Sequence, residues 1–146
     1  MLVIEDKNKG INQDKNINQD VAVQKLIRDT LLALGVAPNL KGFFLIETAL
    51  KLLLDNEDFL FALSKELYPA IAKEINTSKK IEQNIRHARE EAEFAYTILW
   101  RELFKYADPE KKITNGYFLA RVLMYLKDAL SGDLTGMENT KNKEAL

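Results

Sequence analysis

The sequence predicts an all-α protein, a compact bundle of about six helices that contains a helix-turn-helix. All long periodic segments carry apolar residues at spacings of three and four, and no stretch alternates as a half-buried strand does. The length of 146 residues, 47% of them hydrophobic, suits one domain with tails. Both ends are polar, so they cannot bury enough apolar surface to fold alone. We therefore expect a disordered polar arm at 1–19, a helical domain at 20–130 and a flexible tail at 131–146.

The first half of the domain should hold a capped helix, a central buried helix and a short connecting helix. Asp20 is expected to cap the first helix, and Gly35 to end it. A second helix over about 43–54 is apolar nearly all round, which is typical of a helix buried in the centre of a domain. Asp55 or Asn56 then caps a short third helix.

The second half should end in two amphipathic helices. We expect a break near Tyr96 or Thr97, because threonine can cap a new helix there. Trp100, the only tryptophan, is most simply a core residue on that helix. Thr114 or Asn115 should cap the last helix. Its wide apolar stripe consists of Phe118, Leu119, Val122, Leu123, Leu126 and Leu130.

The stretch 67–91 predicts a short helix, a tight polar turn and a longer helix. Asn, Thr and Ser at 76–78 are turn and cap residues. The longer helix, about 78–95, buries one stripe, formed by Ile81, Ile85, Ala88 and Ala92. The opposite edge carries Lys79, Lys80, Gln83, Arg86 and His87. This layout is typical of the recognition helix in a helix-turn-helix, although many charged helix faces are merely solvated.

Several stretches resemble a known family. LYPAIAKEIN, followed by IEQNIRHA, is similar to the C-terminal DNA-binding effector domain of the stage 0 sporulation protein A family. This is the output domain of a response regulator that starts endospore formation in Firmicutes. Leu34-Gly35-Val36, Leu40-Lys41-Gly42 and Thr114-Asn115-Gly116-Tyr117-Phe118 agree in order, so the resemblance covers about residues 22–130. It implies a transcription regulator that binds DNA through its helix-turn-helix.

The recognition helix departs from the family at defined positions. The family pattern is S-R-V-E-R-A-I-R-H-A, and this chain has K-K-I-E-Q-N-I-R-H-A. Glu82, Arg86 and His87 match the pattern. Lys80 and Gln83 stand where the family has arginines, and the turn is one residue shorter. Because glutamine suits adenine better than guanine, we expect the binding mode to be kept and the target sequence to differ.

The resemblance and the spacing together imply roles on double-stranded DNA. The helix would enter the major groove by its N-terminal end. Lys80, Glu82 and Gln83 would read base edges, with Glu82 accepting from cytosine. The sugar–phosphate backbone would be held by Thr77, Ser78, Lys79, Arg86 and His87. The family also implies self-pairing on tandem sites through C-terminal helices.

The local charge agrees with a nucleic-acid partner. The formal net charge is −1, but residues 73–89 hold five Lys or Arg against two Glu. A basic face matters more for DNA binding than a basic total. The chain has no cysteine, no apolar run long enough to span a membrane and no signal peptide. We therefore expect a cytoplasmic protein without a membrane partner.

Enzyme chemistry finds little support in the sequence. His87, the only histidine, and Glu91 could offer two metal ligands, but no third ligand is evident. No Gly-rich phosphate loop is present. We expect no catalytic activity, no cofactor or metal and no small-molecule substrate.

The alternative function is a helical protein-interaction module that has lost DNA binding and modulates a full-length regulator. The changes at Lys80 and Gln83 favour it. The family also carries a phosphorylatable receiver domain ahead of the effector domain, and residues 1–19 are too few to form one. If the chain is complete, phosphorylation should not control it in the usual way.

Overall fold

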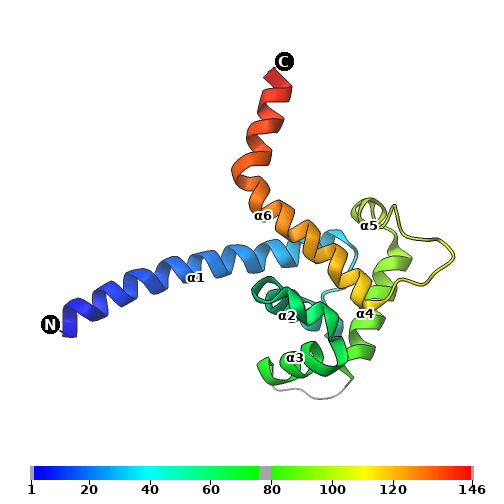
Figure 1. The fold of residues 1–146 in the computed structure, drawn as a ribbon, viewed down its shortest axis with the longest axis horizontal. Coiled ribbons are helices and arrows are strands. Elements are labelled where there is room, and N and C mark those ends of the chain that lie inside the picture. The colour runs from blue at the N-terminus through cyan, green and yellow to red at the C-terminus, as the bar shows by residue number, and fades with distance from the viewer. Residues whose placement is uncertain (1, 76–79, 146) are drawn as a thin grey trace.

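The computed structural model describes residues 2–75 and 80–145, and the side chains of 18–75 and 80–132. Six α-helices lie in these residues: α1 (Leu2–Ala33), α2 (Lys41–Asp55), α3 (Tyr68–Glu74), α4 (Ile81–Ala95), α5 (Ile98–Leu103) and α6 (Asn115–Ala145) (Figure 1). A 3₁₀ segment, η1 (Glu57–Phe61), and a π-helical turn, η2 (Leu63–Leu67), join α2 to α3. The described residues contain no strand, which confirms the predicted all-α class.

Helix α2 is the centre of the fold, as its apolar composition predicted. It contacts α1, α3, α4 and α6. Its apolar side chains with at most 5% of their surface exposed are Phe43, Leu45, Ile46, Ala49, Leu50 and Leu53. Burial of this apolar area is the main force that holds the bundle together.

Helices α2 and α4 touch where Gly42 faces the backbone of α4. A Cβ atom at Gly42 would overlap the carbonyl oxygen of Asn84 and lie 2.5 Å from the Cβ of Ala88. Only glycine allows so close an approach of two helices at this point. The position of α4 on the core therefore depends on the missing side chain of Gly42.

Both ends of the chain lie in the long terminal helices α1 and α6. Helix α1 starts at Leu2, so the polar residues 2–19 are helical, and α6 runs to Ala145 through the expected tail. No proline interrupts either segment, and each residue added to an existing helix forms a further hydrogen bond at little nucleation cost. Figure 1 shows α1 and α6 leaving the packed helices in different directions. The division into arm, domain and tail stays a prediction.

Most of the expected helix boundaries are confirmed, but Asp20 lies inside α1 and does not cap its start. Gly35, with φ of +88°, follows the end of α1. Asn56 Oδ1 accepts a hydrogen bond from the Asp58 amide at the start of η1. The chain breaks at Tyr96, where φ is +52°, and Thr97 caps α5 by accepting from the Trp100 amide at 3.2 Å. Thr114 accepts from the Tyr117 amide at the start of α6.

Aromatic side chains join α5 to α6. Trp100 is 2% exposed, and its ring centroid lies 4.3 Å from that of Phe104 and 5.8 Å from that of Phe118. The rings of Phe104 and Phe118 are nearly parallel, at 7°. The prediction that Trp100 is a core residue is confirmed.

Replacing Thr97 by alanine should destabilise the protein by about 1 kcal/mol, because the amide at the start of α5 loses its side-chain acceptor. Urea unfolding followed by circular dichroism measures this loss. Thr97→Ser keeps the hydroxyl and should retain most of the stability. Equal stabilities of the wild type and Thr97→Ala would contradict the capping role.

Candidate nucleic-acid interface

Helices α3 and α4 form the helix-turn-helix, and α4 turns its apolar stripe inward as predicted. Ile85, Ala88 and Ala92 are fully buried, and Ile81 is 6% exposed. Helix α4 begins at Ile81, later than the expected start at 78, because Lys80 adopts a left-handed conformation with φ of +61°. The predicted backbone contacts Thr77, Ser78 and Lys79 lie outside the described residues.

The remaining predicted site residues lie on the exposed face of α4 and at its start. Lys80, Glu82, Gln83, Arg86 and His87 are all exposed. Their placement within the first two turns of α4 agrees with the geometry of a helix that enters a groove by its N-terminal end. The structure thus brings these five side chains to one end of one helix.

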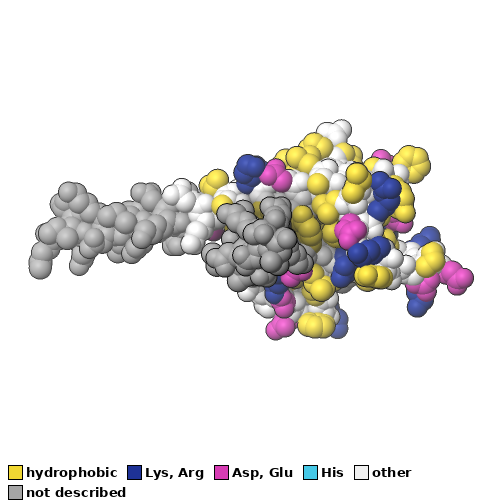
Figure 2. Space-filling model, turned by 90° about the horizontal axis from the view of Figure 1, so that it is seen from above, with side chains coloured by type: hydrophobic (Ala, Val, Ile, Leu, Met, Phe, Trp, Pro, Cys, Tyr) yellow, Lys and Arg dark blue, Asp and Glu magenta, His cyan; other side chains and the backbone are white. Residues whose placement is uncertain are grey.

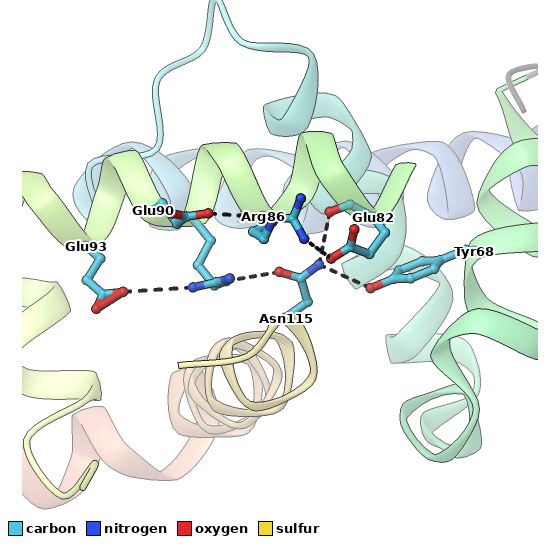
Figure 3. A network of polar contacts seen from close by, with 7 residues as sticks. Tyr68, Glu82, Arg86, Glu90, Glu93 and Asn115 are labelled. Carbon is cyan, nitrogen blue, oxygen red and sulfur yellow. Dashed lines mark hydrogen bonds and ion pairs between the residues drawn. The ribbon is translucent and has the colours of Figure 1, made fainter. Parts of the chain in front are cut away.

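Arg86 is held between two carboxylates in the free protein. Its Nη1 lies 3.1 Å from Glu82 Oε1, and its Nε lies 3.7 Å from Glu90 Oε1 (Figure 3). Exposed pairs of this kind contribute little free energy, so they can exchange for other partners. A phosphate that formed an ion pair with Arg86 would break the Arg86–Glu82 pair. The Glu82 carboxylate could then accept a hydrogen bond from another donor.

A hollow of about 400 Å³ lies along the middle and C-terminal part of α4, from Arg86 to Phe94. Its lining brings Lys112, from the loop before α6, to the same place as Arg86. Glu90, Glu93 and Phe94 line it as well. Basic and acidic groups are therefore mixed beside the recognition helix. On the face seen in Figure 2, Lys, Arg, Asp and Glu side chains are likewise interspersed with hydrophobic ones.

A buried polar network connects α4 to α3 and α6. Arg89 is 7% exposed, and its Nε donates to Asn115 Oδ1 at 3.0 Å. The amide nitrogen of Asn115 donates to the Tyr68 hydroxyl and to the backbone carbonyl of Glu82, both at 3.2 Å. Arg89 Nη1 also lies 3.9 Å from Glu93. Figure 3 shows Asn115 between Tyr68 and the first turn of α4.

The burial of this network shifts two of its groups. Desolvation lowers the pKa of Arg89 from its usual value, while the nearby Glu90 and Glu93 carboxylates oppose that change. Desolvation also raises the pKa of Tyr68, and the hydrogen bond with Asn115 acts in the opposite direction. Arg89 stays a cation and Tyr68 a neutral phenol at physiological pH, so the hydrogen bonds persist there.

This network was not predicted from the sequence. Arg89 lies four residues after Ile85 and three before Ala92, so its place on the buried stripe was visible in the spacing. Asn115 was predicted only as an alternative cap, but Thr114 caps α6 and the Asn115 side chain reaches α4. No spacing rule could show that these two residues meet, because they are 26 positions apart.

The described residues contain neither a candidate metal site nor a candidate membrane span. Within 2–75 and 80–145, no three His, Asp or Glu side chains are grouped so that they could hold a metal ion. Over the same part of the chain, no helix has the length and apolar character needed to cross a membrane.

The fold and this face define a class, the small all-α domains that carry a helix-turn-helix. Within that class, the family model described as "Sporulation initiation factor Spo0A C terminal" matches residues 27–126. The match covers most of the chain, including α2 through α5 and the first turns of α6. The chain belongs to this family, whose members are DNA-binding regulatory domains.

Proposed function

We propose that the protein is a sequence-specific DNA-binding transcription regulator of the cytoplasm, with α4 as its recognition helix in the major groove. The observation that carries the proposal is the exposure of Gln83, Arg86 and His87 on the first turns of the second helix of the helix-turn-helix, in a chain of this family. Gln83 has the donor and acceptor needed to read an adenine edge. Lys80, about one turn before Gln83, and Glu82, next to Gln83 in the sequence, would read neighbouring bases.

The phosphate contacts would lie on both sides of these bases. Arg86 and His87 are one turn further along α4, closer to the groove wall in this docking. Thr77, Ser78 and Lys79 would hold the backbone at the turn. Lys112 would add a contact from the loop, because it lines the same hollow as Arg86. Self-pairing on tandem DNA sites, through the C-terminal part of the domain at 20–130, completes the proposal.

A second function is favoured by the charges and apolar groups of this region. Arg86 is already paired with two carboxylates, so the face is less basic than its lysines and arginines suggest. Phe94 and Ile98 are 90% and 78% exposed. Contiguous exposed apolar surface is typical of protein–protein contact sites. A helical interaction module that modulates a full-length regulator would use such a surface.

The proposal is tested by separating two roles on one helix. Gln83→Ala should remove about 1–3 kcal/mol of discrimination at one base pair and leave binding to scrambled DNA nearly unchanged. Arg86→Ala should weaken binding to all duplexes and lower the slope of log K against log salt by about one unit. The substitution Arg86→Ala also leaves the Glu82 and Glu90 carboxylates without their cation, and these carboxylates then repel the DNA phosphates.

The measurement is a titration of a selected duplex and a scrambled duplex across a salt series. Gln19→Ala on α1 and Arg101→Ala on α5 are matched controls. Both side chains are exposed, and Arg101 lies over the Tyr96 ring, at the end of α4 opposite its first turns. Neither control should change binding. A Gln83→Ala protein with unchanged discrimination would show that α4 is docked in another way. A wild type that binds neither duplex at low salt would leave the interaction module as the function.

A further inference from the structure

We propose that Asn115 is a positioning residue for DNA reading, which fixes the first turn of α4 against α3 and thereby sets where Gln83 meets a base. This inference rests on the proposed function and adds a residue outside the helix-turn-helix to the determinants of specificity. Asn115 is the first residue of α6, and it is 7% exposed.

The orientation of the Asn115 amide is determined by its partners. A guanidinium has only donors, so the atom that faces Arg89 Nε must be the oxygen. A backbone carbonyl only accepts, so the atom that faces the Glu82 carbonyl must be the nitrogen. The two hydrogens of that nitrogen serve Glu82 and the Tyr68 hydroxyl. The side chain has one orientation that satisfies all three contacts.

The three contacts lie on both helices of the helix-turn-helix. Tyr68 is the first residue of α3, and Glu82 is in the first turn of α4. Asn115 therefore bridges the first residue of α3 and the first turn of α4. Arg89 holds the same amide about two turns further along α4, so the bridge resists rotation of α4 as well as translation.

Such a bridge affects base reading more than phosphate contact. Base-edge hydrogen bonds require donor–acceptor distances near 3 Å and good alignment. Flexible Lys and Arg side chains follow a phosphate over a wider range of positions, and their attraction is long-ranged. A small shift of the first turn of α4 should thus lower discrimination before it lowers non-specific binding.

Three variants separate positioning from simple stability. Asn115→Asp keeps the acceptor for Arg89 and adds an ion pair, so the buried guanidinium stays satisfied, but it places an oxygen against the Glu82 carbonyl. Tyr68→Phe keeps the ring and removes one contact. Asn115→Ala removes all three. The matched controls are Tyr117→Phe on α6 and the exposed Asn39→Ala before α2.

Each variant is titrated with the selected and the scrambled duplex at one salt concentration, at a temperature where circular dichroism shows it folded. We expect Asn115→Asp and Asn115→Ala to lower the ratio of the two affinities about tenfold, and Tyr68→Phe by about threefold. The added negative charge of Asn115→Asp should also weaken binding to both duplexes. This general loss should leave the ratio of the two affinities below that of the wild type. The controls should keep the wild-type ratio.

Amide hydrogen exchange without DNA gives an independent result. Asn115→Asp should speed exchange of the amides at 81–86 relative to the amides of α2, because only the first turns of α4 lose their anchor. If a folded Asn115→Asp protein keeps both the affinity ratio and the exchange pattern of the wild type, the positioning role is wrong. If the wild type binds no duplex, the DNA role of Asn115 falls with the proposed function, and the exchange data alone decide whether it anchors α4.

Discussion

Gly42→Ala should destabilise the protein by at least about 2 kcal/mol. The added methyl group would overlap the carbonyl oxygen of Asn84, a backbone atom that cannot turn aside, and would press on Ala88. Alanine in a helix normally gains about 1 kcal/mol over glycine, so a loss of this size requires the clash to outweigh that gain. Urea unfolding of the wild type and the variant measures the change.

Gly132→Ala is the matched control for this substitution. It makes the same change in α6, where no atom lies within 4 Å of the added Cβ position. It should be neutral or stabilising, by up to about 1 kcal/mol. A Gly42→Ala protein as stable as Gly132→Ala would show that α2 and α4 are not in close contact.

Gly42→Ala should also affect DNA recognition. The molecules of this variant that remain folded should discriminate DNA sequences less well, because Asn84, which the new methyl group displaces, is next to Gln83.

Phe118→Ala should have the largest effect on stability, a loss of about 3–5 kcal/mol. The ring is fully buried, lies against Trp100 and Phe104, and joins α6 to α5. Its removal leaves a cavity that two rigid aromatic rings cannot fill by small shifts. The fluorescence of Trp100, the only tryptophan, should shift to longer wavelength as water reaches the cluster.

Phe61→Ala is the matched control, because it removes an exposed phenyl group instead of a buried one. Phe61 is 88% exposed, so its removal should change the free energy of unfolding by less than about 0.5 kcal/mol. Similar losses for the two variants would mean that Phe118 does not lie in the core. Thermal unfolding followed at two wavelengths is sufficient to compare them.

Much of the fold could be predicted because its signals are local. Gly35, Asn56, Thr97 and Thr114 mark helix boundaries through their own backbone preferences and side-chain oxygens. The stripe of α4 follows from spacing alone. The start of α4 was predicted too early, because the left-handed conformation of Lys80 has no propensity signal, lysine being poorly suited to it.

The candidate site was predictable only in part, for a physical reason. The exposed residues of α4 follow from its helical phase. The pairing of Arg86 with Glu82 and Glu90 also follows from i, i+4 spacing, and it makes this face less basic than its lysines and arginines suggest. The contacts of Asn115 join α6 to α3 and α4 across separations of 26 and 47 residues, and they depend on how those helices pack.

The most direct measurement of DNA binding is selection of duplexes from a random pool by the wild-type chain, followed by titration of the enriched sequence. We expect one short sequence to be enriched, with an adenine at the position that becomes degenerate in Gln83→Ala. Its affinity should exceed that for scrambled DNA by at least about a hundredfold and should fall as salt rises. A pool that stays random after repeated rounds at low salt, with no duplex bound, would contradict a role in DNA recognition.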